Sequence, residues 1–227
     1  MEMRCRWMNK EWSELNKTMQ SQLKKKDEFA AGIATLLKLR KELMKQLIAF
    51  QSQLTVEDFS AMPYKNAKGY HSKTIAYSLW HIFRIEDIVA HTLIAGDQQV
   101  FFQGDYQRKI NSPIITTGNE LAGEEIVDFS KTLCLDELYA YMDEVNAAST
   151  KILENLAYED IKRKIPDEKR EVLENLGVVS KDEKAWWLID YWCGKDIKGL
   201  VQMPFSRHWI MHVEACIRIQ EKLLSAR

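Results

Sequence analysis

The chain of 227 residues is predicted to be all-α, with four principal helices arranged as a four-helix bundle. Only nine glycines and four prolines interrupt the sequence. Over long stretches, apolar residues recur at intervals of three and four positions, which is the period of an amphipathic helix. Strand signals are few, and the one at residues 114–117 is short and isolated. We therefore expect the core to consist of helices.

The first half of the chain predicts three helices. Residues 5–25 form the N-terminal helix. Its apolar positions are Trp7, Met8, Trp12, Leu15 and Met19. Asp27 is expected to start the second helix, whose apolar positions continue to Phe50. After a polar connection, residues 73–95 form the third helix, and Gly96 fits its C-cap, where a left-handed backbone is common.

Two further helices are predicted in the second half, on either side of a long insertion. Residues 96–118 have the composition of a loop with short helical turns, and residues 135–156 form a helix. Residues 157–203 contain an aromatic-rich helical piece, which we interpret as an insertion packed over one end of the bundle. Pro204 suits the first turn of the last helix, which continues to about residue 224.

Length and composition favour one domain with an extension. Residues 1–26 are predicted to form a helical extension, and residues 27–227 the bundle domain with its insertion. The formal net charge of −1 and the lack of a basic patch give no case for nucleic-acid binding. No apolar run reaches the roughly 18 residues of a membrane span, and no apolar signal region follows Met1. Because the four cysteines are scattered, we expect reduced thiols and a cytoplasmic protein.

The main candidate site is a histidine pair near the C-terminus, His208 and His212. Residues four apart lie one turn apart on the same face of a helix, so both imidazoles share a mostly apolar stripe. Buried imidazoles with no carboxylate beside them need partners, and a divalent metal satisfies both. His81, on another strongly apolar helical segment, completes a three-histidine site with an open coordination position.

Other interpretations compete with this site. A helical His-x-x-x-His pair taken alone is more often two core histidines that bond to protein acceptors. Cys216 lies one turn beyond His212, and a small core residue is favoured over a thiolate ligand. His71 and His91 do not share the direction of His81 on a helix, so surface or loop positions are expected for both.

Acidic and aromatic residues near the histidines leave further alternatives. Glu86 fits an outer partner of the metal ligands, an acid/base group or a surface charge, whereas Asp87 is expected to be a surface charge. The tryptophans mostly fill core volume. Trp80 and Trp209 adjoin candidate ligands, but neighbouring residues on a helix diverge by about 100°, so neither has to line the pocket.

Two short segments carry a family resemblance. Residues 78–87, Ser-Leu-Trp-His-Ile-Phe-Arg-Ile-Glu-Asp, and residues 208–213, His-Trp-Ile-Met-His-Val, resemble the DinB-like (YfiT-like) metal-binding four-helix-bundle superfamily. The resemblance covers roughly residues 27–224. It implies a divalent metal, commonly zinc or nickel, and often a homodimer. The metal ligands that it implies are His81, His208 and His212. The N-terminal helix and the Trp-rich insertion look longer than the minimal family pattern.

The resemblance and the open three-histidine site favour metal-assisted chemistry. The leading hypothesis is transfer of a low-molecular-weight thiol to an electrophilic substrate, because a metal lowers the pKa of a bound thiol. Its alternative is hydrolysis by metal-activated hydroxide, with a carboxylate such as Glu86 reaching the water. A third hypothesis is a non-catalytic metal-binding or stress-response dimer, since fold alone does not settle function.

Overall fold

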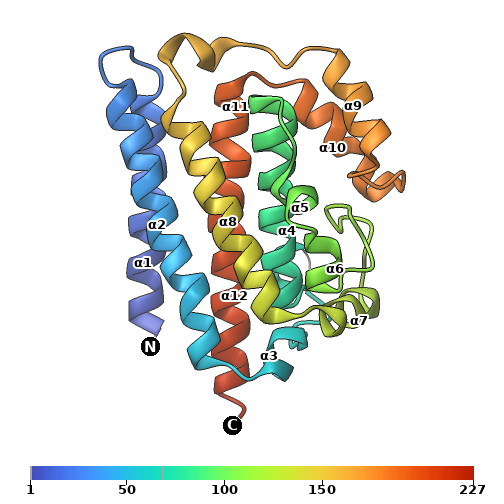
Figure 1. Ribbon diagram of the computed structural model, residues 1–227. Helices are drawn as coiled ribbons and strands as arrows, with labels where there is room; N and C mark the ends of the chain where they lie inside the picture. The colour runs from blue at the N-terminus through green and yellow to red at the C-terminus, as the bar shows by residue number, and fades with distance from the viewer. Residues whose placement is uncertain (1, 68) are drawn as a thin grey trace.

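The structure, a computed structural model, describes residues 2–67 and 69–227, with side chains from residue 10 onward (Figure 1). In the part of the chain that it describes, the regular secondary structure is helical and there is no strand, only an isolated bridge between Lys164 and Asp196. The predicted all-α class is therefore confirmed, and residues 114–117 are irregular. The apolar positions predicted at Trp7 and Met8 lie outside the described side chains.

Five long helices determine the arrangement. They are α1 (Glu2–Gln22), α2 (Phe29–Gln53), α4 (Ile75–Asp87), α8 (Leu135–Glu154) and α12 (His208–Leu224). α4 contacts α8 and α12, and α2 contacts the same two helices, so these four helices close a ring of contacts. α1 packs along α2 and also reaches α12 (Figure 1). None of the helices in the described part of the chain is both long and apolar enough to cross a membrane.

Shorter elements connect and cover these helices. They are α3 (Val56–Ser60), η1 (Gly69–His71), η2 (Ile88–Ala95), α5 (Val100–Gln103), α6 (Tyr106–Ile110), α7 (Glu124–Thr132), η3 (Tyr158–Lys162), α9 (Glu168–Leu176), α10 (Glu183–Cys193), α11 (Ile197–Gln202) and η4 (Met203–Arg207). α5 and α6 are the short helical turns that were predicted between residues 96 and 118. α9, α10 and α11 belong to the predicted insertion, and Figure 1 shows α9 and α10 beside one end of the long helices.

Three helix boundaries were predicted from a single residue, and two of these predictions are confirmed. Gly96 ends η2 with a left-handed φ of 77°, as expected, and Pro204 lies in the first turn of η4. The predicted start at Asp27 is wrong, because α2 begins at Phe29. Turns continue through Glu28, whose backbone N–H donates to the carbonyl of Lys25, and its side chain makes no capping bond.

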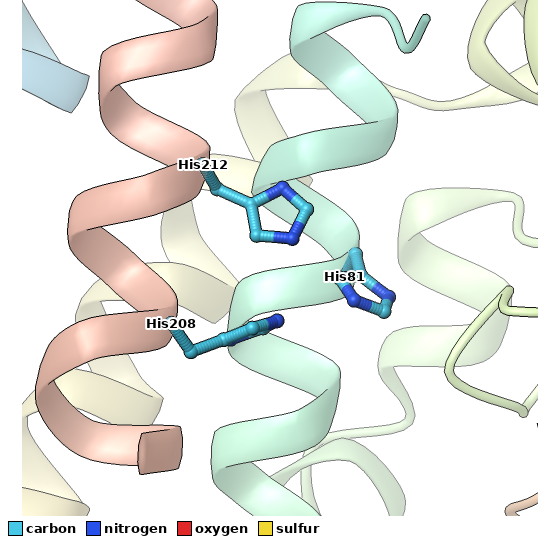
Figure 2. A group of neighbouring side chains, drawn as sticks. All are labelled: His81, His208 and His212. Carbon is cyan, nitrogen blue, oxygen red and sulfur yellow. The ribbon is translucent and has the colours of Figure 1, made fainter. Parts of the chain in front are cut away.

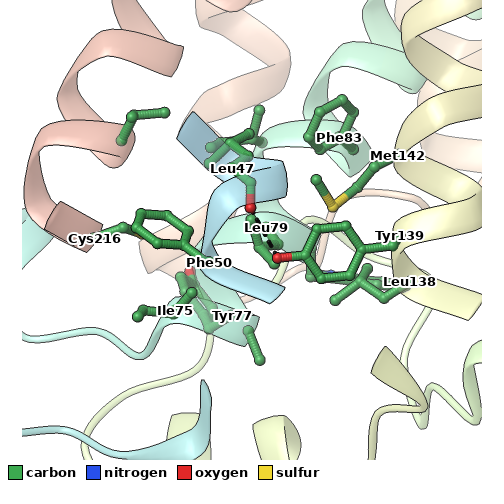
Figure 3. Packing of buried hydrophobic residues seen from close by; sticks show 14 of the residues in the cluster. Leu47, Phe50, Ile75, Tyr77, Leu79, Phe83, Leu138, Tyr139, Met142 and Cys216 are labelled. Carbon is green, nitrogen blue, oxygen red and sulfur yellow. Dashed lines mark hydrogen bonds between the residues drawn. The ribbon is translucent and has the colours of Figure 1, made fainter. Parts of the chain in front are cut away.

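The apolar core surrounds α4, which is buried along its whole length. In the apolar cluster of which Figure 3 gives a close view, side chains from α2, α4 and α8 pack together. The hydroxyl of Tyr139 on α8 donates to the backbone carbonyl of Leu47 on α2 at 2.9 Å. Cys216 lies in this cluster, which confirms the expectation of a small core residue. Among the described side chains, Cys134, Cys193 and Cys216 are free thiols, and Cys5 lies outside this part of the structure.

One buried carboxylate, Glu86 on α4, joins the ring of helices. It accepts two hydrogen bonds from the guanidinium of Arg40 on α2, at 2.6 and 2.7 Å. Ser149 on α8 donates to it at 2.6 Å, and the indole N–H of Trp209 on α12 donates at 2.8 Å. Arg40 and Glu86 are almost fully buried. Glu86 is therefore a structural ion-pair partner, neither a surface charge nor a free acid.

The expectation that Asp87 is a surface charge is wrong. Its carboxylate is completely buried and accepts hydrogen bonds from the backbone N–H groups of Val100 and Phe101, both at 2.9 Å. The Tyr141 hydroxyl donates to it at 2.8 Å, and Arg84 lies 3.4 Å away. Because α4 is covered on every side, its polar residues had to find partners inside the protein.

Replacing the central carboxylate is expected to destabilise the fold strongly. Glu86→Gln keeps the side-chain volume but removes the counter-charge of buried Arg40, so the free energy of unfolding should fall by about 3–5 kcal/mol. Urea denaturation followed by circular dichroism measures this loss. Glu124→Gln, which breaks the exposed pair with Lys65, is the matched control and should leave the midpoint unchanged. A loss below about 1 kcal/mol for Glu86→Gln would contradict a central role for this pair.

Candidate metal centre

Three histidines from two helices meet beside one cavity (Figure 2). His81 comes from α4, and His208 and His212 come from successive turns of α12. All three are buried, and one potential ligand atom from each lies within 4.8 Å of the others. The ring centroids are 4.6 to 5.0 Å apart. The structure therefore brings together the three residues that the sequence predicted as metal ligands.

A backbone carbonyl fixes the orientation of His81. Its Nδ1 lies 2.7 Å from the carbonyl oxygen of Thr117. Because a carbonyl can only accept a hydrogen bond, Nδ1 carries the proton and Nε2 keeps a free lone pair. This is the arrangement found at metal-binding histidines, where the second ring nitrogen is held by an acceptor.

The segment that supplies this carbonyl, residues 115–118, lies along α4 as a strap. Each of its four consecutive backbone carbonyls accepts a hydrogen bond from an α4 side chain. The other bonds run from Arg84 to Ile115 (2.9 and 3.0 Å), from Trp80 to Thr116 (3.2 Å) and from Tyr77 to Gly118 (3.0 Å). Sequence reasoning missed this strap, because a carbonyl acceptor leaves no mark on residue identity.

Gly118 allows the strap to approach α4 closely. Its φ of 77° lies in the left-handed region, and a Cβ there would be 3.1 Å from Cε2 of Tyr77. A side chain at this position would therefore combine backbone strain with a crowded contact. The same ring of Tyr77 stacks on His81, with centroids 5.4 Å apart and an interplanar angle of 12°.

The two histidines of α12 lack protein partners. Nδ1 of His208 and both ring nitrogens of His212 are buried without a hydrogen bond to any described residue. A buried polar atom left in this state normally costs about 1–3 kcal/mol. The edge-on ring of Tyr70, 4.7 Å from the His212 centroid, supplies packing but no acceptor for these nitrogens. A metal ion bound by the three histidines would provide a partner for one ring nitrogen of His208 and one of His212.

Burial keeps the three imidazoles neutral. It lowers the pKa of His81 to about 4, against an ordinary value of 6.5. Burial also holds the pKa values of His208 and His212 well below their usual range, and neighbouring histidines add to the effect. Neutral imidazole is the form that binds metal, so protons do not compete with a metal at neutral pH.

The donor set fits a divalent metal with an open coordination position. One potential ligand atom from each histidine lies within 4.8 Å of the others, and neutral imidazole nitrogen is a ligand that zinc and nickel accept. The described residues offer no fourth ligand in this cluster. Burial raises the pKa of the Cys216 thiol to about 12, which disfavours the thiolate that a metal needs.

The histidines open on a cavity of about 540 Å³. Its walls are mainly aromatic and aliphatic, and no aspartate or glutamate of the described chain lines it. The lining residues include Tyr70, Lys73, Tyr77, Asn119, Trp187, Leu188, Tyr191, Trp192, Met203 and Pro204. α10 of the insertion therefore forms one wall of the pocket. Trp80 and Trp209 are buried in the core and do not line it, as the sequence analysis allowed.

The remaining histidines lie outside the site, and one expectation for them is wrong. His71 lies in the short η1 and contacts Arg218, in agreement with a loop position. His91 is buried in η2, with Nδ1 2.7 Å from a carboxylate oxygen of Asp97. The helical period assigned it to the surface, but α9 packs against η2 and covers this helix.

Comparison with known proteins gives no relative from which to transfer a function. No family model matches the chain, and no curated protein matches it.

The three-histidine cluster is expected to bind about one divalent metal ion per chain. His208→Ala and His81→Ala should each abolish stoichiometric binding, because two nitrogens alone hold zinc or nickel weakly. Elemental mass spectrometry after reconstitution and dialysis measures this, and circular dichroism verifies that the variants fold. His71→Ala, which removes a histidine outside the cluster, should keep the metal. Full occupancy in His208→Ala would rule out the site.

The metal-free protein is expected to lose stability as the pH falls below the ordinary histidine pKa. The unfolded chain then takes up protons that the buried imidazoles refuse, so the free energy of unfolding decreases from about pH 6.5 toward about pH 4. Urea denaturation at several pH values measures this slope. His212→Leu removes one of the three groups and should give a shallower slope. Parallel curves for the two proteins would show that His212 does not contribute.

Proposed function

We propose that this protein is a DinB-like four-helix-bundle protein that binds zinc or nickel and transfers a low-molecular-weight thiol to an electrophile. One observation carries the proposal: three neutral, buried imidazoles face a cavity without carboxylates. The ring of contacts among α2, α4, α8 and α12 supports the bundle, with ligands on facing helices as in other bundle sites. The order and spacing of the ligands, with one histidine on α4 and a pair on α12, support the family assignment.

Each part of the site has a role in this reaction. His81, His208 and His212 would hold a divalent metal, whose positive charge would supply a lower pKa for a thiol that binds at the open position. His81, His208 and His212 hold the metal and take no part in proton transfer. The carbonyl of Thr117 holds His81 in the tautomer that leaves Nε2 free. The wall from α10 limits water around the reacting groups.

The cavity lining favours thiol transfer over hydrolysis. A hydrolase of the kind considered from the sequence needs a carboxylate near the attacking water. Glu86 does not line the cavity, and its oxygens already accept hydrogen bonds from Arg40, Ser149 and Trp209. A thiol depends less on such a base, because its free pKa of about 8.5 lies far below that of water, at about 15.7, so a metal would need to lower it only slightly. The roomy cavity and the lack of a fourth ligand among the described residues also favour an enzyme over a storage or structural metal site.

Thiol consumption by the metal-loaded protein tests the proposal. Zinc- and nickel-loaded protein is incubated with cysteine or glutathione and a panel of epoxides, alkyl halides and activated alkenes, and the remaining thiol is titrated. We expect consumption above the uncatalysed rate with at least one electrophile, and loss of at least 100-fold in His208→Ala. His71→Ala should retain the activity. Consumption equal to the background for every pair would refute thiol transfer, and size-exclusion chromatography with light scattering tests the implied homodimer.

A further inference from the structure

Lys73 is the only lysine, arginine, aspartate or glutamate among the described residues that line the cavity. Lys73 lies two residues before α4 and is about half-buried. Its Nζ lies 4.7 Å from the centroid of the Tyr77 ring, and the same ring stacks on His81. The ammonium and the first metal ligand therefore contact one aromatic side chain.

The charge of Lys73 has no counter-charge in the described structure. No carboxylate of the described chain lies within ion-pair distance of its ammonium. Several other lysines and arginines do pair with a carboxylate three residues away in the sequence. Burial lowers the pKa of Lys73, and its positive charge lowers the pKa values of His81 and His212. The ammonium is thus electrostatically coupled to the site, and the aromatic face of Tyr77 compensates only part of its lost hydration.

Metal binding would make this imbalance larger. A divalent cation held by three neutral histidines adds positive charge to a cavity that already holds an ammonium and no acidic side chain. Partly buried charges of one sign are costly unless a partner neutralises them. Since no carboxylate of the described chain lines the cavity or pairs with Lys73, a negatively charged ligand would supply the missing counter-charge.

We infer that the substrate carries a carboxylate that pairs with Lys73 while its reactive group lies at the three histidines. This inference rests on the proposed function and names the substrate class. A carboxylate is favoured over a phosphate because one ammonium matches one negative charge, and no arginine of the described chain lines the cavity for bidentate phosphate binding. Asn119 also lines the cavity, and because its Oδ1 accepts from the Thr117 hydroxyl, its amide nitrogen is the group that could donate to a ligand.

Residues of α10 and η4 line the cavity as well, and their side chains indicate what the ligand carries besides its carboxylate. Leu188 and Trp192 are buried on α10, and Met203 lines the same side from η4. Trp187 and Tyr191 pack edge to face at 5.7 Å, and Trp187 remains 48% exposed. Aromatic side chains with free faces are favourable surfaces for an apolar or aromatic body. The cavity thus matches an organic carboxylate with an apolar portion.

Binding of matched charged and neutral thiols to cobalt-loaded protein tests the inference. The probes are 3-mercaptopropanoate, its neutral amide 3-mercaptopropanamide, and 2-mercaptoethyl phosphate, and the cobalt absorption spectrum reports thiol coordination without any turnover. In the wild type we expect the carboxylate to bind about 10–100-fold more tightly than the amide, as for a hydrogen bond to a charged group. Lys73→Met should abolish this preference with unchanged amide affinity, and Lys73→Arg should restore it.

The control is a lysine of similar kind outside the cavity lining. Lys195 lies over the ring of Tyr191 at 4.1 Å, and Lys195→Met should behave as the wild type. Equal cobalt content in all variants shows that the metal site is intact. A wild type without preference for the carboxylate, a preference that survives in Lys73→Met, or tighter binding of the phosphate would each overturn the inference.

Failure of the proposed function has a different signature. If no thiol changes the cobalt spectrum of any variant, thiol transfer is refuted, and the anion preference is then measured by calorimetry with 3-phenylpropanoate and 3-phenylpropanamide. A Lys73-dependent preference for 3-phenylpropanoate would keep the carboxylate assignment. Equal binding of this pair would refute the carboxylate assignment as well.

Discussion

The buried carboxylate of Glu86 is the interaction on which the arrangement of the long helices depends. It receives hydrogen bonds from Arg40, Ser149 and Trp209, which belong to α2, α8 and α12. The guanidinium of Arg40 also lies over the Trp209 ring, 4.5 Å from its centroid. Because Trp209 is adjacent to His208, fixing the tryptophan also fixes the rotation of α12 about its axis. The same contact that joins the helices therefore directs the histidine pair toward the cavity.

A second network of hydrogen bonds, made by Asp87 and Arg84 of α4, positions the strap that holds His81. Asp87 accepts hydrogen bonds from the backbone N–H groups of residues 100 and 101. Arg84 donates to the carbonyl of residue 115. From there the strap continues to the carbonyl that orients His81. A buried charge pair of this kind is weak evidence for stability, since apolar replacements are often as stable. Its value here lies in position, because it determines where the strap meets α4.

The sequence predicted well which three histidines meet and predicted poorly what surrounds them, for physical reasons. His208 and His212 follow from helical spacing, and Gly96 and Pro204 follow from backbone preferences that are local. Burial of Asp87 and His91 could not be inferred, because an amphipathic period assumes that one face of a helix meets water. α4 and η2 are covered on every side by segments distant in sequence. The strap is also invisible in sequence, since any residue provides a backbone carbonyl.

No acidic side chain of the described chain lines the cavity, and this limits the chemistry that the cavity supports. Glu86 and Asp87 are buried but fully engaged with arginines and other donors, while the remaining carboxylates of the described chain do not line the cavity. The cavity keeps neutral imidazoles, one ammonium and aromatic walls. In such surroundings an anion gains from the Lys73 ammonium, and no carboxylate of the described chain lines the cavity to act as a general base. A pocket built in this way stabilises a preformed nucleophile better than it generates one by general base catalysis, which is the physical reason to expect a thiolate there.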